Sequence, residues 1–349
     1  MVDARAVEGE RGKRLLGEAL TAAASLAPDQ SVDKFRVVAQ SAPSAAAHFD
    51  LGVALDRAGR GIEAEQAYRA ATASGNGALA YQAAARAAAL ASARGDAAAA
   101  RESVSLARAA LGDPPFARVL QAIIELALGN PAAAQAAVKP VLAQAPNDAG
   151  ALCAMARAQL AQGHAGVARI FAARAAQADP SDPDPLLLKA AIARASGEPA
   201  AEIEALRAAV EVDGDSSRAQ LAFGRALYER GQLGPALEAI QEAFELDPAS
   251  YGASLAYGQA LAAANQRKPA EQALARAIAL SPRAAEPHFE LARLKLDVDG
   301  DAQAALAEAK LFLNLSTQPP PPAHPIHALV QRCEEALKQR GQASVVQTR

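Results

Sequence analysis

Along this chain, small and apolar residues recur with the spacing of amphipathic helices, and the predicted helices come in pairs. Residues 217–250 show the unit most clearly, with Gly231 between two helical patterns and Pro248 after the second. The residues that share a face are Phe223, Gly224 and Leu227 in the first pattern and Ala236, Ile240 and Ala243 in the second. Glycine and proline commonly end helices. The pattern therefore predicts two antiparallel helices joined by a short turn.

The same unit returns along most of the chain. Its starts fall at residues 45, 81, 115, 149, 183, 217, 251 and 285, so the first interval is 36 residues and the others are 34. The eighth position is always small: Gly52, Ala88, Ala122, Ala156, Ala190, Gly224, Gly258 and Ala292. Position 20 is small in seven units: Ala64, Ala100, Ala134, Ala168, Ala236, Ala270 and Ala304. Small residues there would allow the two helices to cross closely.

Position 15 marks the turn between the helices. It is Gly59, Gly95, Gly129, Gly163, Gly197 and Gly231 in six units, then Asn265 and Asp299, the last followed by Gly300. With 23 glycines in 349 residues, eight random positions should hold about half of one. Glycine, and after it asparagine, readily adopts the left-handed backbone that ends a helix. These residues are therefore predicted to form the turns.

This combination of small positions, turn glycine and terminal proline resembles the tetratricopeptide repeat, a helix–turn–helix unit of 34 residues. The terminal prolines are Pro146, Pro180, Pro248 and Pro282. The resemblance covers residues 45–318. It implies an all-α fold, a right-handed superhelical solenoid of about eight antiparallel helix pairs with capping helices at both ends.

The segments outside the repeats are expected to cover their ends. Residues 1–10 have no apolar period and are expected to be disordered, and residues 11–44 are expected to form a degenerate helical pair. Residues 319–326 are expected to form a proline-rich segment. A capping helix is expected over 327–340 and a loose tail over 341–349.

Three units depart from the pattern. In the third, Gln121 and Glu125 stand where apolar residues are expected, whereas a face one step out of phase is apolar. This suggests that its first helix is rotated or that its turn is one residue short. In the fifth unit Glu202 takes the small position 20, and in the eighth an extra residue lies near Gly300. The aromatic residue expected at position 4 is missing from every unit.

Charge and composition argue against two classes of function. The chain has 35 basic and 38 acidic residues and a net charge of −3, whereas a nucleic-acid binder usually shows a strongly basic face. No apolar run approaches the roughly 18 residues of a membrane span. The best candidate for a signal-peptide core, residues 14–27, is interrupted by Glu18 and suits an amphipathic helix better.

The compartment is expected to be cytoplasmic by default, and periplasmic or envelope-associated if a signal was removed. Cys153 and Cys333 lie in distant units, so no bridge between them is expected. The bias toward Ala, Arg, Gly and Pro suggests a bacterial source. The oligomeric state remains open.

No constellation for catalysis is visible. The sequence has no GxSxG, HExxH or CxxC motif, no phosphate loop and no dinucleotide fingerprint, so neither an enzyme nor a cofactor is expected. His48 and His288 fall on the packed side of first helices and are expected to be partly buried. An acidic run beginning at Asp297 partly fits a calcium loop, but Ala302 stands where glycine is required, so no metal site is expected.

The family resemblance implies a binding groove. In this family, positions 2, 5, 9 and 12 of the first helices point into the concave surface where peptides or partner helices lie. In the N-terminal half these positions are mostly small and apolar. The predicted partner-binding residues are Arg157, Arg194, Leu221, Arg225, Tyr228, Gln259, Phe289 and Arg293.

Arginine at intervals offers planar forks for carboxylates, so an acidic or C-terminal peptide segment is the expected ligand. The alternative is that these arginines are solvated, some of them paired with Asp184, Glu229 or Asp297. The function expected from these features is a non-catalytic scaffold for protein–protein interaction. Two alternatives stay open: an assembly factor of a bacterial secretion, pilus or motility complex, and a regulatory subunit of an enzyme.

Overall fold

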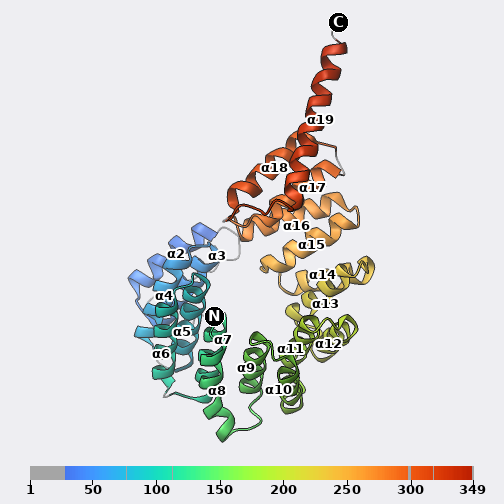
Figure 1. Cartoon of the computed structure of the whole chain (residues 1–349). Coiled ribbons are helices and arrows are strands. Elements are labelled where there is room, and N and C mark those ends of the chain that lie inside the picture. Colours follow the sequence, from blue (N-terminus) through green and yellow to red (C-terminus); the bar gives the residue numbers. More distant parts are fainter. Residues whose placement is uncertain (1–27, 76, 112, 298–299, 317, 348–349) are drawn as a thin grey trace. The chain divides into compact units, whose positions relative to one another are not determined.

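The computed structural model describes residues 28–75, 77–111, 113–297, 300–316 and 318–347. All regular elements in these ranges are α-helices (Figure 1), which confirms the all-α prediction. The chain divides into two compact units, residues 1–202 and 203–349, with the division inside α12 (Pro199–Val212). Residues 1–10, expected to be disordered, and the first part of the expected N-terminal helical pair lie outside the described residues.

The first unit is built from helix pairs in chain order. Its helices are α2 (Pro28–Ser41), α3 (Ala45–Arg57), α4 (Gly61–Ser74), α5 (Gly77–Ala93), α6 (Ala97–Leu111), α7 (Pro115–Ala127), α8 (Pro131–Gln144), α9 (Ala149–Ala161), α10 (Ala165–Ala178) and α11 (Asp184–Ala195). Each second helix packs on the first helix of its own repeat and on that of the next, as α4 does on α3 and α5. At the start, Phe35 and Val38 bury α2 against α3.

The second unit continues this order. Its helices are α13 (Ser217–Glu229), α14 (Leu233–Leu246), α15 (Tyr251–Ala263), α16 (Arg267–Leu280), α17 (Glu286–Asp297), α18 (Ala302–Leu315) and α19 (Pro325–Gln347). Serines begin two of the first helices: Ser216 accepts from the N–H of Ala219, and Ser250 from that of Ala253. Such caps satisfy backbone donors that the first turn leaves unpaired.

The turn prediction is confirmed. The backbone is left-handed, with φ between 55° and 81°, at Gly59, Gly95, Gly129, Gly163, Gly197, Gly231, Asn265 and Gly300. Asn265 has the least positive φ of the eight and is the one residue there with a side chain. The short left-handed turn reverses the chain and places each second helix antiparallel to its first.

The close crossing at position 8 depends on the residue at position 24. A Cβ added to Gly224 would lie 2.5 Å from Ile240 Cγ1, and one added to Gly258 would lie 2.6 Å from Leu274 Cγ. Gly52 faces Tyr68 in the same way. Where position 8 is alanine, the residue it packs with is smaller: Val104 for Ala88, Val138 for Ala122 and Ala172 for Ala156. In these six repeats glycine accompanies a large partner and alanine a small one, whereas the fifth repeat carries Ala190 at position 8 with Leu206 at position 24.

The third repeat corrects the sequence interpretation. Its first helix is not rotated and its turn is not shortened, because Ala122 is buried at position 8 and Gly129 is left-handed at position 15. Glu125 is 4% exposed and forms two bonds with Arg101, Nε to Oε1 at 2.7 Å and Nη2 to Oε2 at 2.8 Å. A charged partner on α6 therefore lets the helix keep its register with a buried carboxylate.

The eighth repeat takes up its extra residue before the second helix. Gly300 forms the left-handed turn, and Asp301 caps the N–H of Ala304. Ala305 is fully buried, whereas Ala304 is only half-buried. The close-contact residue of this helix is thus Ala305, one residue later than the sequence count placed it.

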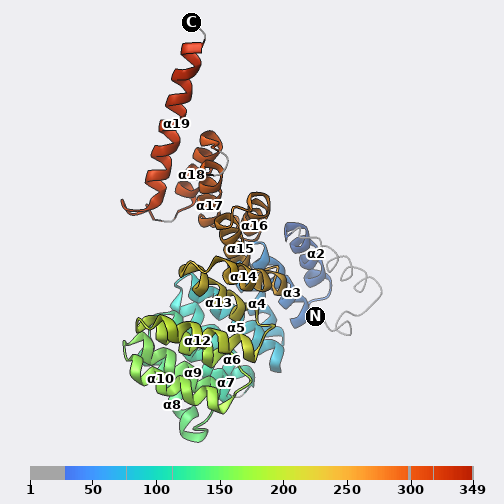
Figure 2. The same ribbon diagram turned by 90° about the vertical axis from the view of Figure 1, so that its right-hand side faces the viewer.

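The C-terminal helix is longer than expected. It begins at Pro325, where a first-turn proline loses no helical hydrogen bond, and runs to Gln347, so the expected loose tail is helical up to that residue. It lies beside α18 and extends past it, as Figures 1 and 2 both show. Ile326, Leu329 and Cys333 bury it against the eighth repeat.

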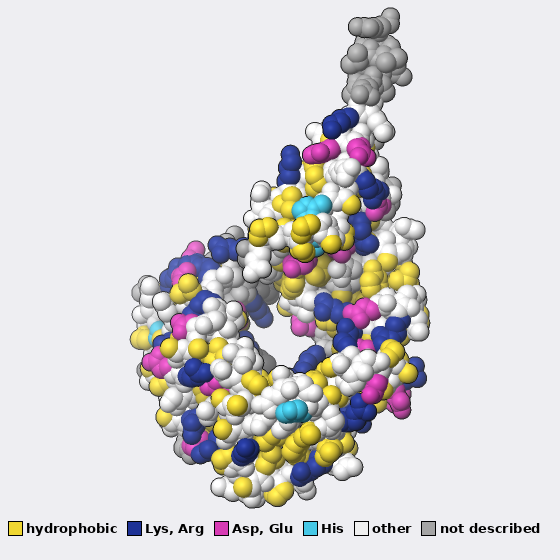
Figure 3. Space-filling view, viewed as in Figure 1, with side chains coloured by type: hydrophobic (Ala, Val, Ile, Leu, Met, Phe, Trp, Pro, Cys, Tyr) yellow, Lys and Arg dark blue, Asp and Glu magenta, His cyan; other side chains and the backbone are white. Residues whose placement is uncertain are grey.

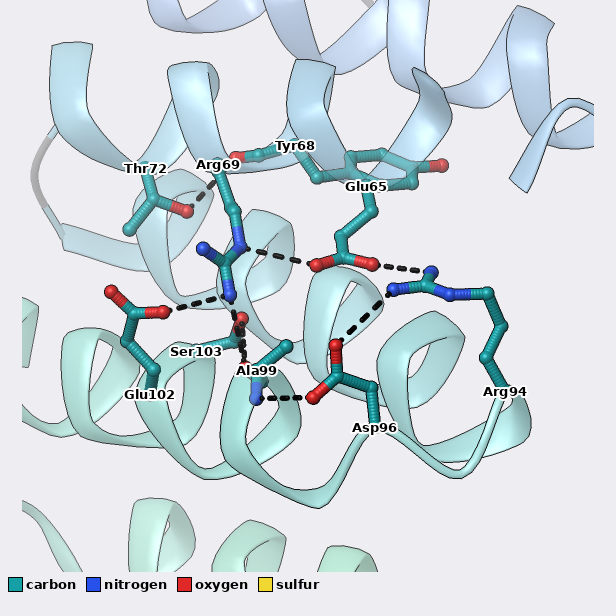
Figure 4. Close-up of polar contacts among 9 residues, drawn as sticks. All are labelled: Glu65, Tyr68, Arg69, Thr72, Arg94, Asp96, Ala99, Glu102 and Ser103. Carbon is teal, nitrogen blue, oxygen red and sulfur yellow. Dashed lines mark hydrogen bonds and ion pairs between the residues drawn. The ribbon is translucent and has the colours of Figure 1, made fainter. Parts of the chain in front are cut away.

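An ion network joins the first two repeats on α4 and α6 (Figure 4). The buried Glu65 pairs with Arg69 at 3.2 Å and with Arg94 from the α5–α6 turn. Arg69 also reaches Glu102 at 2.9 Å and the carbonyl of Ala99 at 3.2 Å. Because these groups lie on second helices and a turn, the network stabilises the stacking of repeats and leaves the first helices free of it.

Candidate protein-binding surface

In each unit, the first helices of successive repeats contact one another. These contacts link α3, α5, α7, α9 and α11 in the first unit and α13, α15 and α17 in the second. Side chains at positions 2, 5, 9 and 12 form what is called here the first-helix face of each unit. Arg157 and Arg194 belong to the face of the first unit, and the other six predicted residues to that of the second.

Arg194 is bound within the fold. Its Nε donates to Oε1 of Glu202 at 2.6 Å, and the Glu202 side chain is only 6% exposed. Glu202 occupies the position where other repeats carry alanine, so this arginine neutralises a carboxylate that the helix crossing buries. The partner differs from the three acidic residues named from the sequence.

Arg293 and Gln259 share another buried carboxylate. Arg293 Nη2 lies 2.8 Å from Oε2 of Glu290, and Gln259 Nε2 donates to Oε1 of the same residue at 3.0 Å. Glu290 is 8% exposed. The three side chains form one compact unit that holds α15 against α17. Binding a ligand carboxylate at Arg293 would require competition with Glu290.

Arg157 and Arg225 are the predicted arginines without a carboxylate partner among the described residues. Arg225 is exposed and donates from Nη2 to the carbonyl of Gly252 at 3.1 Å, which orients its guanidinium toward the start of α15. Arg157 is half-buried on α9. These two groups therefore retain donors for an outside ligand.

The predicted apolar groove residues are used mainly in packing. Leu221 and Tyr228 lie against the cluster of Ile240, Ala256 and Ala260, and both are half-buried. Phe289 contacts Phe312 at 5.7 Å and His324 at 5.4 Å between ring centroids. Phe289 thus links α17 to α18 and to the proline-rich segment, and its own side chain is half-buried.

Two groups of importance were not singled out from the sequence. Phe116 and Ile123 on α7 are 48% and 47% exposed, although they are large and apolar. The sequence did hold a signal for them, because they occupy positions 2 and 9 of the third repeat, two of the positions expected to line the groove. Glu290 also had a local signal, since it lies three residues before Arg293 on one helix, a spacing at which side chains meet. On the face seen in Figure 3, hydrophobic and basic side chains predominate over α8–α10, and basic and acidic side chains are mixed over α13 and α14.

A small pocket of about 110 Å³ lies between α6 and α7, and its polar groups are already paired. Arg108 makes a two-bond contact with Asp113, at 2.7 and 2.9 Å, and a third bond to Gln121. Arg118 reaches the same carboxylate at 2.6 Å, and these hydrogen bonds and charges hold the pKa of Asp113 below its usual range. The paired groups leave no free donor set for a polar ligand.

The acidic groups near the eighth repeat are held in ion pairs, and both cysteines are buried. Asp297 pairs with Arg332 at 2.7 Å. Glu308 binds His288 at 2.8 Å and Lys295 at 2.6 Å, and His288, which was expected to be partly buried, is buried at 8% exposure. Burial raises the pKa of the Cys153 thiol to about 11 and also raises that of Cys333. Among the described residues, no group of three His, Cys, Asp or Glu side chains could hold a metal ion.

A search for helices long and apolar enough to cross a membrane found none in the described part of the chain. In comparisons with known proteins, no protein-family model and no curated protein matches this sequence.

Two solved structures resemble most of the chain. One is the Cut9–Hcn1 hetero-tetramer of the APC/C, at a TM-score of 0.56 and 14% identity over 87% of this chain and 59% of that one. The other is yeast Tom70, at a TM-score of 0.57 and 14% identity over 97% of this chain and 66% of that one. The chain thus spans roughly two thirds of these proteins or less. Both are tetratricopeptide-repeat proteins, and the likeness shows that this chain has the tetratricopeptide-repeat fold.

Proposed function

We propose that this chain is a non-catalytic scaffold that binds another protein through its first-helix faces. The observation that carries the proposal is that these faces keep exposed side chains of the kind that interfaces use, whereas Arg194 and Arg293 on the same faces are already paired within the fold. Phe116 and Ile123 are exposed in the first unit, and Arg225 has no carboxylate partner among the described residues of the second. Large apolar or aromatic side chains and arginine are common energetic centres of protein interfaces.

On the second unit, Arg225 supports recognition of an acidic or C-terminal segment. Its guanidinium is held by a single bond to the Gly252 carbonyl, so further N–H donors remain for a carboxylate. Tyr228 lies one turn further along α13 and offers aromatic surface with a hydroxyl. Arg293 is the weaker candidate because Glu290 already occupies its fork.

The test is site-specific photo-crosslinking in the native cells. A benzoylphenylalanine replaces Phe116 or Tyr228 on the first-helix faces, where an aromatic ring already stands. The matched controls place it at Ile170 on α10, which is 60% exposed, and at Gln241 on α14, also exposed. The proposal expects a discrete crosslinked protein from the face positions and none from the control positions.

Crosslinking of equal yield from Ile170 and Gln241, or none from any position, would contradict the proposal. Replacing Arg225 with alanine should weaken capture of the same protein at Tyr228, about tenfold if a charged hydrogen bond is lost.

A further inference from the structure

The first unit exposes two large apolar side chains, Phe116 and Ile123, along one side of α7. Phe116 and Ile123 are seven residues apart, so they lie about 10 Å from each other along one side of the helix. The rings of Phe116 and Tyr81 are nearly perpendicular, with their centroids 4.9 Å apart, and this contact orients the Phe116 side chain. The two side chains are nearly half exposed although their chemistry favours burial. They are thus candidates for anchors of an interface.

The helices on both sides of α7 carry small residues facing the same way. On α5 these are Ala85 and Ala89, and on α9 the equivalent position 2 is Gly150. An added Cβ at Gly150 would stand 3.5 Å from Val119, so α9 passes close to α7. Phe116 and Ile123 project further than these short side chains and can meet a partner's side chains directly, and the longer side chains on the flanking helices include Gln82 and Arg157.

The three helices carry no exposed carboxylate. The sequences of α5 and α9 contain neither Asp nor Glu, and the one acidic residue of α7 is Glu125, which is buried against Arg101. The basic groups are Arg118, which pairs with Asp113 at 2.6 Å, Arg157, which has no described partner, and Arg86, which lies 5.7 Å over the Phe49 ring. This surface, called here the α5–α7–α9 face, is therefore apolar in the middle and positive at its flanks.

We propose that the α5–α7–α9 face binds a helical segment of a partner protein, with an apolar stripe on that helix and acidic side chains beside the stripe. The proposal rests on the scaffold function proposed above and names the partner's chemistry. Two anchors about 10 Å apart match residues i and i+7 of a helix laid along α7. Acidic side chains on its flanks would meet Arg86 and Arg157.

A helix fits this face better than an extended peptide does. An extended segment presents unpaired N–H and C=O groups, and the main chains of α5, α7 and α9 are already bonded within their helices. A helix satisfies its own backbone and can lie on an apolar surface without that cost. A membrane surface is disfavoured because recognition of anionic lipid usually takes a cluster of four to eight basic residues, and of the three arginines here Arg118 is paired with Asp113.

The test uses two synthetic helical peptides of 18 residues with capped ends and a fluorescein label. Both carry leucines at i, i+3, i+7 and i+11, and the flanking positions are glutamate in one peptide and lysine in the other. Fluorescence anisotropy with the full chain should show that the glutamate peptide binds at least about tenfold more tightly. Ile123→Glu should weaken its binding by at least about tenfold.

Ile170→Glu is the matched control, because Ile170 is an exposed isoleucine on a second helix of the same unit, and it should leave binding within about twofold. Circular dichroism checks that both variants keep their helices. If Ile123→Glu does not fold, Arg157→Ala supplies the second test, with an expected loss of about threefold or more.

Equal affinity for the lysine peptide, or no loss in Ile123→Glu and Arg157→Ala, overturns the proposal. So does binding to phosphatidylglycerol vesicles that Ile123→Glu abolishes while the glutamate peptide stays unbound, or concentration-dependent dimerisation that the same variant removes. If crosslinking at Tyr228 still captures a protein in those cases, the scaffold function stands and only this partner assignment fails.

Discussion

The α5–α7–α9 face of the first unit and the α13–α15–α17 face of the second occupy the same repeat positions but differ in chemistry. The first has no exposed carboxylate and two half-exposed apolar anchors, Phe116 and Ile123. The second carries Glu229, Glu286 and Glu290, and its arginine Arg293 is bound to one of them. The two faces therefore differ in how many acidic side chains surround their arginines.

The difference teaches that repeat position tells where a side chain lies but not whether it is available. Arg157 and Arg293 both occupy position 9 of a first helix. Arg157 has no described partner, whereas a buried glutamate one turn away holds Arg293. Three sets of substitutions in these two units, given in order of decreasing effect on the protein, test how far the contrast extends.

The largest effect, a loss of folding stability, is expected from Gly224→Leu. This substitution places a large side chain where α13 of the second unit's face packs on α14. An added Cβ lies 2.5 Å from Ile240 Cγ1 and 3.0 Å from the Ile240 backbone nitrogen, so neither a rotamer change nor a small shift relieves the clash. Overpacking should lower the free energy of unfolding by about 2–3 kcal/mol, measured by urea denaturation.

Gly234→Ala is the control for this substitution, since Gly234 lies on α14, the helix that Gly224 crosses, with no neighbour within 4 Å of an added Cβ. It should raise the free energy of unfolding by about 0.5–1 kcal/mol, because alanine favours a helix over glycine. An unchanged midpoint in Gly224→Leu would contradict the helix crossing described here.

Glu290→Ala should make the second face resemble the first. Removing the carboxylate frees Arg293 and Gln259, at a cost of about 1–2 kcal/mol in unfolding free energy for the lost ion pair with Arg293 and the lost hydrogen bond from Gln259. Binding of the glutamate peptide to the second unit should then become measurable by anisotropy in an Ile123→Glu background. No gain in binding would mean that the acidic residues are not what separates the two faces.

The smallest effect is a dependence of stability on pH that has opposite signs in the two units. Burial raises the pKa of Asp50 to about 6, so between about pH 4 and 6 its ionisation begins to oppose folding, and this cost is complete above pH 6. Asp50→Asn should therefore stabilise the protein by about 1 kcal/mol at pH 8, after allowance for its partial exposure, and by nothing near pH 3.

Glu308 in the second unit gives the opposite sign. Its burial is outweighed by hydrogen bonds from His288 and Lys295, which hold its pKa below the usual value. Its contribution is present above the unfolded-state pKa and is lost as the pH falls through the folded-state pKa. Glu308→Gln should thus destabilise at pH 7 and have little effect under strongly acidic conditions. Urea unfolding at pH 3, 5 and 8 compares both variants, and the same sign in both would refute the assignment.

The fold could be predicted from the sequence because the repeat signals are local. The glycine at the turn is required by the backbone conformation there, and the small residue at position 8 is required by the short distance between two adjacent helices. Both recur at a fixed interval along the chain. Repeat three misled because the partner that makes its buried Glu125 acceptable, Arg101, lies 24 residues earlier on α6. No local pattern reveals such a pair.

The candidate site could be predicted only in part for the same reason. The first-helix positions follow from the register, but Arg194 meets Glu202 across a turn, and Phe289 packs on His324 from beyond the last repeat. Whether an arginine is free or neutralised therefore depends on tertiary contacts. The apolar character of the first unit's face and the register positions of Phe116 and Ile123 were readable from its sequence, and the extent to which these two side chains are exposed was not.

The most direct test of the account is hydrogen exchange of the full chain with and without the glutamate peptide, read by mass spectrometry. Exchange should be slower in α5, α7 and α9, where the bound helix stabilises the first-helix face, and unchanged in the outer parts of α4, α6 and α8. Protection confined to the second helices, or no protection while the peptide is bound, would contradict the claim that the first-helix face is the binding surface.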